Sequence, residues 1–347
     1  MMTLRGPAGP STKSTQPRNI RLVYVASVCL GIIYGVLFRL GTSGHFQGNG
    51  TATMTVSFLV LGSLMIGLLA VYPVERATAQ PIWRWFLLPM PPIVLACCIS
   101  LAFRIEGLIC MIFVLPGALL CSIVGGVLGG VLARVFRVRQ GTVTCLAVMP
   151  FILAPLETLI SPPVQMREVR TEIAIHAPAS VVWRNIERVK PIASWELKDS
   201  WAQRIGFPRP VEATLSYEGV GGVRHASFER GLLFLETVNA WEPEKLLAFS
   251  IRADSSHIPS ATLDQHVTIG GRYFDVLDGE YRLEPVPDGT ILLHLSSRQR
   301  LSTDFNPYAG LWTDAVMRTL QNSILGVIKA RCEREAQSEA KADQDNH

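Results

Sequence analysis

Hydrophobic residues are concentrated in the first half of the chain, where they form long apolar runs separated by short polar loops. The five runs span residues 22–40, 54–72, 86–103, 108–133 and 143–160. Each is close to the length of about 20 residues that a helix needs to cross the hydrocarbon core of a bilayer. We therefore predict an α-helical membrane bundle of about five transmembrane helices within residues 21–162.

The third and fifth runs contain residues that disturb a regular transmembrane helix. Three prolines at the start of the third run predict an irregular or interfacial first turn. The fifth run contains Pro150, Pro155 and Glu157, so it either crosses the membrane or is a kinked, half-inserted segment. An acid inside an apolar run is a functional candidate, but Glu157 lies near the end of its run and can reach the interface.

Lysine and arginine are shared unevenly by the loops between the runs. They are frequent before the first run and after the second and fourth, whereas Arg39 and Arg104 stand alone after the first and third. Because basic loops remain cytoplasmic, we expect a multi-pass protein of the inner cell membrane with a cytoplasmic N-terminus. Five crossings put the C-terminal part outside the cytoplasm, and four would leave it inside.

Small residues recur in the fourth run at a spacing that favours close helix packing. Gly125, Gly126, Gly129 and Gly130 form two overlapping pairs, each four positions apart. Such pairs let the backbone of a neighbouring helix approach closely. The neighbour is either another helix of the same bundle or a second copy of the chain, which would make a homo-oligomer.

From about residue 165 the pattern becomes that of a water-soluble, sheet-rich domain. Alternation over residues 169–176, with Ile173 and Ile175 on one face and Glu172 and His176 on the other, indicates a strand. A helix over 178–189 follows, with Pro178 in its first position. Further strands are predicted over residues 212–217, 222–229, 232–241, 246–252, 271–283 and 290–301, separated by glycine turns and by a hairpin signal at 288–289.

The last predicted element is a long amphipathic helix over residues 307–333. Its apolar face is formed by residues that recur every four positions, namely Trp312, Val316, Leu320, Ile324 and Ile328. Asn306 and Pro307 suit the cap and the first helical position. The polar residues 336–347 and the basic tail 1–20 are predicted to be disordered.

Composition and charge restrict the function only a little. The chain of 347 residues is 49% hydrophobic and 17% charged, as expected for a membrane part joined to a soluble part. A net charge of +4 without a basic, aromatic-interleaved patch gives no reason to expect a nucleic-acid partner. The seven cysteines form no disulfide framework or paired metal spacing. Asp254, His257, Asp264 and His266 lie in a loop-like stretch, and we expect no metal and no cofactor there.

The order of elements in the second half resembles that of the START-like superfamily, also known as the Bet v 1-like or polyketide cyclase/dehydrase (SRPBCC) family. The residues that carry the resemblance are the opening segment Ile173-Ala174-Ile175-His176-Ala177-Pro178-Ala179-Ser180-Val181-Val182-Trp183, the turn and strand Asp288-Gly289-Thr290-Ile291-Leu292-Leu293 and the final helix. The resemblance covers about half of the chain and implies an α+β helix-grip domain over about residues 165–335. In such a domain a curved antiparallel sheet wraps the long C-terminal helix around an apolar cavity. The five apolar runs are not part of the family's common domain.

The resemblance implies membrane-tethered binding of a hydrophobic or lipid-like small molecule, for lipid transfer or sensing. A polyketide cyclase- or dehydratase-like enzyme acting on a membrane-soluble substrate and a non-catalytic membrane assembly module are the alternatives. The candidate ligand-binding residues are Trp195, His225, Glu229, Tyr273, Asp275 and Tyr281. His225, Glu229 and Asp275 could serve acid–base chemistry if their strand faces point inward, and would be solvated if they point outward. The sequence names no catalytic residue and leaves open whether any reaction is catalysed.

Overall fold

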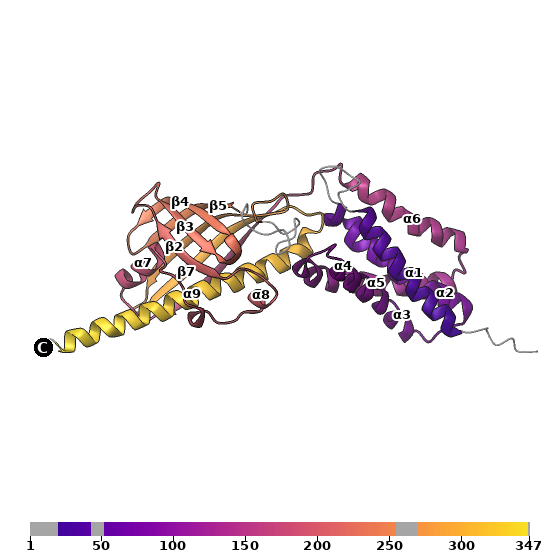
Figure 1. Cartoon of the computed structure of the whole chain (residues 1–347), viewed down its shortest axis with the longest axis horizontal. Helices are drawn as coiled ribbons and strands as arrows, with labels where there is room; N and C mark the ends of the chain where they lie inside the picture. Colours follow the sequence, from indigo (N-terminus) through magenta and orange to yellow (C-terminus); the bar gives the residue numbers. More distant parts are fainter. Residues whose placement is uncertain (1–19, 43–51, 255–268, 346–347) are drawn as a thin grey trace, which may run out of the picture.

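A computed structural model describes residues 20–42, 52–254 and 269–345 of the chain. It consists of a helical bundle and a curled sheet with one long helix, arranged end to end (Figure 1). The long helix starts beside the bundle and runs along the sheet to the far end of the molecule. The junction between the two parts is therefore formed by the first turns of this helix.

The bundle is formed by the apolar runs. Its elements are α1 (Ile20–Gly41), η2 (Ala52–Met54), the π-helical turn η3 (Ser57–Gly62), α2 (Ser63–Ala77), α3 (Trp83–Leu87), α4 (Met90–Ala102), α5 (Leu108–Arg134) and α6 (Gln140–Glu157). Among the described residues, they make five helices that are long and apolar enough to cross a membrane. The irregular start predicted for the third run is present, because α3 and α4 are separate helices that meet near Pro89.

The glycines of α5 are packed inside this bundle. Gly125 and Gly129 lie against the backbone of α2, Gly126 lies against Pro89 and the Trp85 carbonyl, and Gly130 lies against the Trp85 ring. A methyl group at any of the four positions would come too close to these atoms. Packing within the chain was one of the two alternatives for these glycines, and association of two copies through them stays a prediction.

The described part of the soluble domain forms a seven-stranded antiparallel sheet with the strand order β1-β7-β6-β5-β4-β3-β2. The strands are β1 (Gln165–Ile175), β2 (Pro210–Leu215), β3 (Val223–Phe228), β4 (Leu233–Glu242), β5 (Leu246–Asp254), β6 (Phe274–Pro285) and β7 (Ile291–Leu301). The helices are α7 (Ala179–Glu187), α8 (Trp201–Arg204) and α9 (Asn306–Asp345), with short turns η4 (Ser194–Glu196) and η5 (Glu229–Gly231). The predicted order of elements is confirmed, and the domain has the helix-grip fold.

The core of the domain lies between the concave face of the sheet and α9. Leu325, Ile328 and Cys332 on the helix pack against Ile175 of β1 and Leu293 of β7, and none of the five is more than 1% exposed. The face of β1 that carries Ile175 therefore points into the core.

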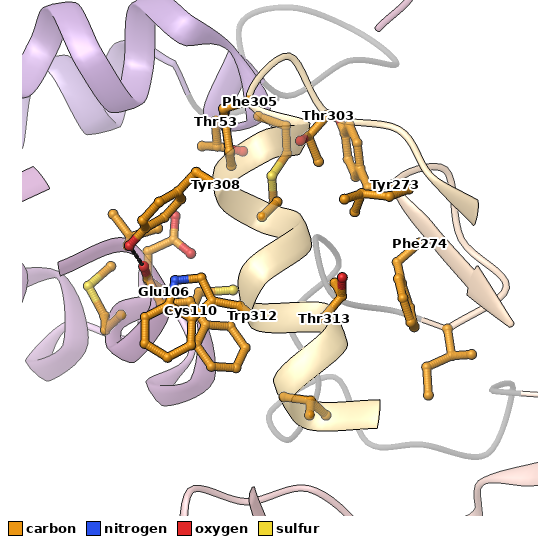
Figure 2. Close-up of a pocket in the computed structure, with 18 of the residues that line it drawn as sticks. Thr53, Glu106, Cys110, Tyr273, Phe274, Thr303, Phe305, Tyr308, Trp312 and Thr313 are labelled. Carbon is orange, nitrogen blue, oxygen red and sulfur yellow. Dashed lines mark hydrogen bonds between the residues drawn. The ribbon is translucent and has the colours of Figure 1, made fainter. Parts of the chain in front are cut away.

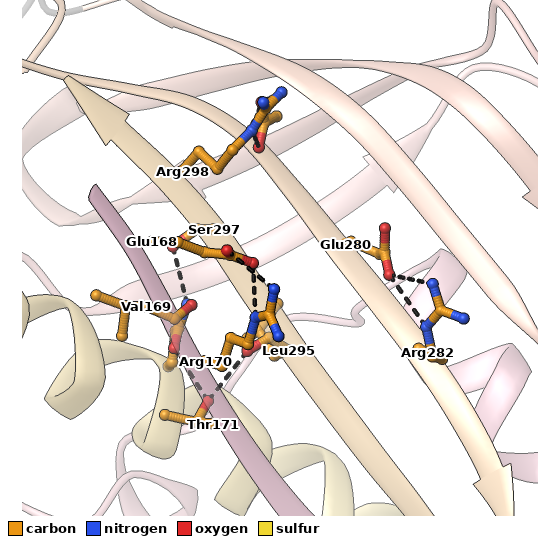
Figure 3. A network of polar contacts seen from close by, with 11 residues as sticks. Glu168, Val169, Arg170, Thr171, Glu280, Arg282, Leu295, Ser297 and Arg298 are labelled. Carbon is orange, nitrogen blue, oxygen red and sulfur yellow. Dashed lines mark hydrogen bonds and ion pairs between the residues drawn. The ribbon is translucent and has the colours of Figure 1, made fainter. Parts of the chain in front are cut away.

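The outer face of the sheet is charged. Ion pairs join Glu168 to Arg170 on β1 and Glu280 to Arg282 on β6 (Figure 3). Exposed pairs of this kind contribute at most about 1 kcal/mol each. They mark the solvent side of the sheet rather than a binding site.

Two helix boundaries differ from the sequence prediction. Pro178 has an extended ψ of 148° and is the N-cap of α7 rather than its first helical residue. The helix α9 continues to Asp345, so its last turns replace a predicted disordered tail. Strong helix formers fill this stretch, and Arg184 of α7 pairs with Glu335 and Glu339 on it.

Candidate ligand-binding site

A cavity of about 150 Å³ lies where the helix-grip domain meets the helical bundle. The soluble domain contributes the first turns of α9, the start of β6 and the end of β7, and the bundle contributes η2, η3 and the start of α5. In Figure 2, Tyr308 and Trp312 of α9 face Glu106 and Cys110, which belong to the bundle. Neither part of the chain would form this cavity alone.

The wall of the cavity is apolar and rich in aromatic rings. Its aromatic residues are Phe58, Phe113, Phe207, Tyr273, Phe274, Phe305, Tyr308 and Trp312. Several of these rings pack on one another across the junction. Phe113 of α5 stacks on Trp312 of α9 with ring centroids 5.0 Å apart, and Phe207 lies 6.2 Å from Phe113.

Polar groups in the wall are engaged with protein partners. Glu106 is buried and pairs with the buried Arg39, with an Nε–Oε1 distance of 2.5 Å. The hydroxyl of Thr303 donates to the side chain of Asn306, and that of Thr313 donates to the Gly310 carbonyl. The wall therefore presents mainly carbon to the cavity and suits an apolar occupant.

Hydrogen bonds from the start of α9 and the preceding loop hold the domain to the end of the bundle and to the linker before β1. The Tyr308 hydroxyl donates to the Phe113 carbonyl of α5 at 2.5 Å. The side-chain amide of Asn306 donates to the carbonyl of Pro163 at 2.7 Å, and the backbone N–H of Asp304 donates to the carbonyl of Met54 at 3.2 Å. Asn306, predicted as a helix cap, instead ties α9 to the linker before β1.

A small polar niche of about 20 Å³ adjoins the cavity, and Met54 and Tyr273 line both. Glu157 lies in this niche and accepts hydrogen bonds from the backbone N–H and the hydroxyl of Ser57, at 3.0 and 2.7 Å. It thus caps the start of η3, which gives this acid a structural role. Burial and the nearby charge of Glu157 raise the pKa of Asp304, and Arg272 opposes this shift.

The structure brings only one of the six sequence-predicted ligand residues into the cavity wall, and this is Tyr273. Tyr281 is 3% exposed in the core between sheet and helix, and Asp275 is half-buried outside the lining of the cavity. The three others, Trp195, His225 and Glu229, are exposed on the surface of the domain. Trp195 lies under the guanidinium of Arg334, which is 5.1 Å from the ring centroid.

Local irregularities of the strands explain why these residues are apart. The β6 strand has a bulge between Val276 and Asp278, so the residues that alternate before it change face after it. In β3 the buried residues are Arg224 and Ala226, which puts His225 on the outer face. The polar patch expected from His225, Glu229 and Asp275 is therefore not assembled.

The sequence did not predict a buried ion pair within the helix-grip domain. Arg224 of β3 and Glu236 of β4 are directly opposite in register, pair through Nη1 and Oε2, and are 3% and 5% exposed. The Arg224 guanidinium lies 5.7 Å from the ring centroid of Phe249 and 6.0 Å from that of Tyr281. Burial raises the pKa of Glu236, and the guanidinium opposes this effect. The sequence does contain a signal for this pair. Arg224 shares a face of β3 with Ala226, and Glu236 shares a face of β4 with Val238, so each is a charged residue on an otherwise apolar face.

The bundle residues of the cavity wall were also missed, because nothing in the sequence shows which loops of the two parts meet. Within the described part of the chain, His, Cys, Asp and Glu form no group of three that could hold a metal ion. His257, Asp264 and His266 from the sequence analysis lie outside the described residues.

The fold and cavity define a helix-grip domain joined to a bundle of five apolar helices. No protein-family model and no curated protein matches the chain. Solved structures similar to it include DynU16, a protein in the dynemicin biosynthetic locus, at 16% identity and a TM-score of 0.29. That match covers 49% of this chain and 48% of DynU16, so the chain spans about half of that protein's length.

Two further solved structures are matched over nearly their whole length. The protein TTHA0849 from Thermus thermophilus is 16% identical with a TM-score of 0.32, and 49% of this chain covers 99% of it. A START superfamily protein from Mycobacterium smegmatis is 11% identical with a TM-score of 0.31, and 48% of this chain covers 97% of it. At these scores the likenesses say nothing about activity, and the helix-grip assignment follows from the strand order and α9.

Proposed function

We propose that the protein binds the apolar part of a lipid or other membrane-soluble molecule in the cavity between its two parts. The observation that carries this proposal is the composition of the wall, in which aromatic rings from α5 and α9 enclose a space with no free polar group described in it. An apolar occupant would be stabilised by about 25 cal/mol for each Å² removed from water.

The volume of the cavity in this structure limits how much of such a molecule can enter it. A dry, apolar protein cavity of about 150 Å³ can hold a molecule the size of benzene. The cavity therefore takes the end of a hydrocarbon chain or a single ring, and a longer chain requires the wall to move. The polar end of an amphiphile would stay outside this apolar space.

The place of the cavity supports exchange with a bilayer. The helix α5 has 27 residues and is about 40 Å long, roughly 10 Å more than the hydrocarbon core. We propose that its first turns extend beyond the bilayer and bring the cavity to the membrane surface. A tethered domain meets membrane molecules at a high effective concentration, which suits lipid transfer or sensing.

We propose the topology that the basic loops favour, with a cytoplasmic N-terminus and the helix-grip domain on the opposite side. Five crossings are consistent with this arrangement. The enzyme alternative needs a titratable group available in the cavity wall. Glu106 is the described carboxylate there and is already paired with Arg39, so no observation favours this alternative.

Mass spectrometry of small molecules that co-purify with the full-length protein tests the proposal. We expect a hydrophobic molecule to co-purify with the wild type and to be lost from Met317→Trp, which fills the cavity. Leu311→Trp is the matched control, because Leu311 lies on the same helix but is 67% exposed. Equal amounts of the same molecules in both variants would show that they bind elsewhere.

A further inference from the structure

Tyr308 of α9 reaches into the backbone of α5. Its hydroxyl accepts a hydrogen bond from the Gly117 N–H at 3.0 Å and donates one to the Phe113 carbonyl at 2.5 Å. Residues 113 and 117 are four apart, so this amide and carbonyl are the groups that pair with each other in an α-helix. One side chain of the soluble domain therefore bridges a turn of a bundle helix.

The sequence of α5 is suited to this insertion. Pro116 lies inside the helix and has no N–H, so the carbonyl of Ile112 lacks its helical donor. At Gly117 a Cβ atom would lie 3.0 Å from Cζ of Tyr308, closer than an ordinary contact. Helices bend where a proline or an inserted side chain interrupts the hydrogen-bond ladder, and both occur here.

The same tyrosine is part of the cavity wall. Its ring faces the cavity, while its hydroxyl holds α5 (Figure 2). Ligand pockets generally measure about 300–1,000 Å³, so a space of about 150 Å³ must widen to admit more than a chain end. Leu301 of β7 and Val316 of α9, on the domain side of the wall, are 2% and 5% exposed, whereas the α5 side meets the domain through Tyr308 and the ring of Trp312.

We infer that Tyr308 couples occupation of the cavity to the conformation of α5. A hydrocarbon chain that enters the cavity displaces the Tyr308 ring, which withdraws its hydroxyl from Phe113 and Gly117 and changes the bend of α5 at Pro116. The inference rests on the proposed function. A ligand that prefers the displaced state shifts the population toward it, and by linkage release of α5 strengthens ligand binding.

A change in the bend of α5 would also affect α2, because the two helices are closely packed. Beyond Pro116, toward its C-terminal end, α5 packs on the backbone of α2 through Gly125 and Gly129. Because this contact is too close to allow sliding without repacking, α5 and α2 respond together. Binding in the cavity is thereby transmitted across the bundle.

Electron–electron distance measurements on the full chain in phosphatidylcholine nanodiscs test the coupling. Nitroxides at Leu120→Cys and Leu311→Cys, which are 65% and 67% exposed, report the position of α9 relative to α5. The cysteines that are not buried are first replaced by serine. We expect dodecanoate, the probe, to shift this distance in the otherwise wild-type chain.

Tyr308→Phe keeps the ring in the wall and removes the hydroxyl. We expect it to show the shifted distance without dodecanoate, and to bind dodecanoate about three- to tenfold more tightly, because less of the closed state has to be displaced. Tyr72→Phe is the matched control, since the Tyr72 hydroxyl also donates to a backbone carbonyl, that of Val138 at 2.7 Å, away from the junction. It should respond like the wild type.

Binding is measured separately, by cross-linking of dodecanoate with a terminal diazirine to α9. Cross-linking without any change in distance, or a Tyr308→Phe protein that behaves as wild type, would overturn the coupling and leave the proposed function standing. Absence of cross-linking on α9 would overturn the proposed function itself.

Discussion

Arg224 and Glu236 form a buried ion pair in the core of the helix-grip domain. Each is taken out of water at a considerable cost, which the pairing offsets. The alternation of β3 does not by itself reveal this, because Arg224 shares a face with Ala226 while His225 shares one with Val223. The neighbouring strands decide which face of β3 points inward. The sequence of β3 alone does not show this, because it carries no information about the strands that pair with it.

We predict that Arg224→Met destabilises the domain by about 3–5 kcal/mol, because Glu236 is left buried without its partner. The double variant Arg224→Met with Glu236→Leu should recover most of this loss. Urea unfolding followed by tryptophan fluorescence measures both. A double variant that is as unstable as the single one would show that packing, and not the unpaired charge, is responsible.

Glu196 provides a test at acid pH. Hydrogen bonds from Arg331 lower the pKa of this carboxyl to about 2, with further contributions from the Ala193 N–H and Arg334. A folded-state pKa below the unfolded value stabilises the domain above about pH 4.5, and this contribution is lost as the pH falls toward 2.

Glu196→Gln should therefore lower the stability at pH 7 by about 1–2 kcal/mol, less than the full shift because Arg334 is half exposed. The difference from wild type should shrink as the pH falls from 5 to 2, measured by the midpoint of thermal unfolding. Glu218→Gln is the control, because its side chain is 61% exposed. A Glu196→Gln effect that is constant over this pH range would refute the assignment.

At the scale of elements, the sequence predicted almost every helix and strand, and the reason is periodicity. Apolar runs of about 20 residues and strands that alternate in steps of two are local signals. The bulge in β6 and the extension of α9 to Asp345 were not predicted, since they depend on contacts with β7 and α7. The bulge reverses the alternation along β6, which separates Asp275 from Tyr281, while the exposed His225 follows from the face of β3.

The packing of α5 on α2 gives a prediction for one element. Gly129→Leu should destabilise the bundle by at least about 2 kcal/mol, because a side chain there meets the backbone of Leu68. Gly141→Leu in α6 is the matched control, since no atom lies within 4 Å of a Cβ at that position. Thermal unfolding in detergent compares them, and equal stability of the two variants would argue against the close helix contact.

For the whole molecule, the feature that the sequence could not show is the junction. Tyr308 was visible only as part of an amphipathic helix, and Phe113 only as part of an apolar run. Their contact requires the first turn of α9 to dock beside α5, which no local pattern specifies. The resemblance implies a cavity between the sheet and the long helix, whereas the described cavity lies at the junction, where eight of its 22 lining residues come from the bundle, outside the resemblance.

The topology is tested at this scale with reporters fused after His347. We predict active alkaline phosphatase and dark green fluorescent protein, as expected for a domain outside the cytoplasm. The same fusions after Arg139 should give the reverse, because this basic loop is predicted to be cytoplasmic. A fluorescent fusion after His347 would place the domain inside.

The shared wall of the cavity is tested most directly by mapping where a diazirine-tagged dodecanoate cross-links to the full chain in nanodiscs. We predict labels on both sides of the junction, near Val114 of α5 and near Met317 of α9. Val114→Trp should remove the labels from both helices, whereas Leu120→Trp, on the exposed side of α5, should leave them unchanged. Labels confined to exposed bundle surfaces, or unaffected by Val114→Trp, would contradict a ligand cavity built jointly by the domain and the bundle.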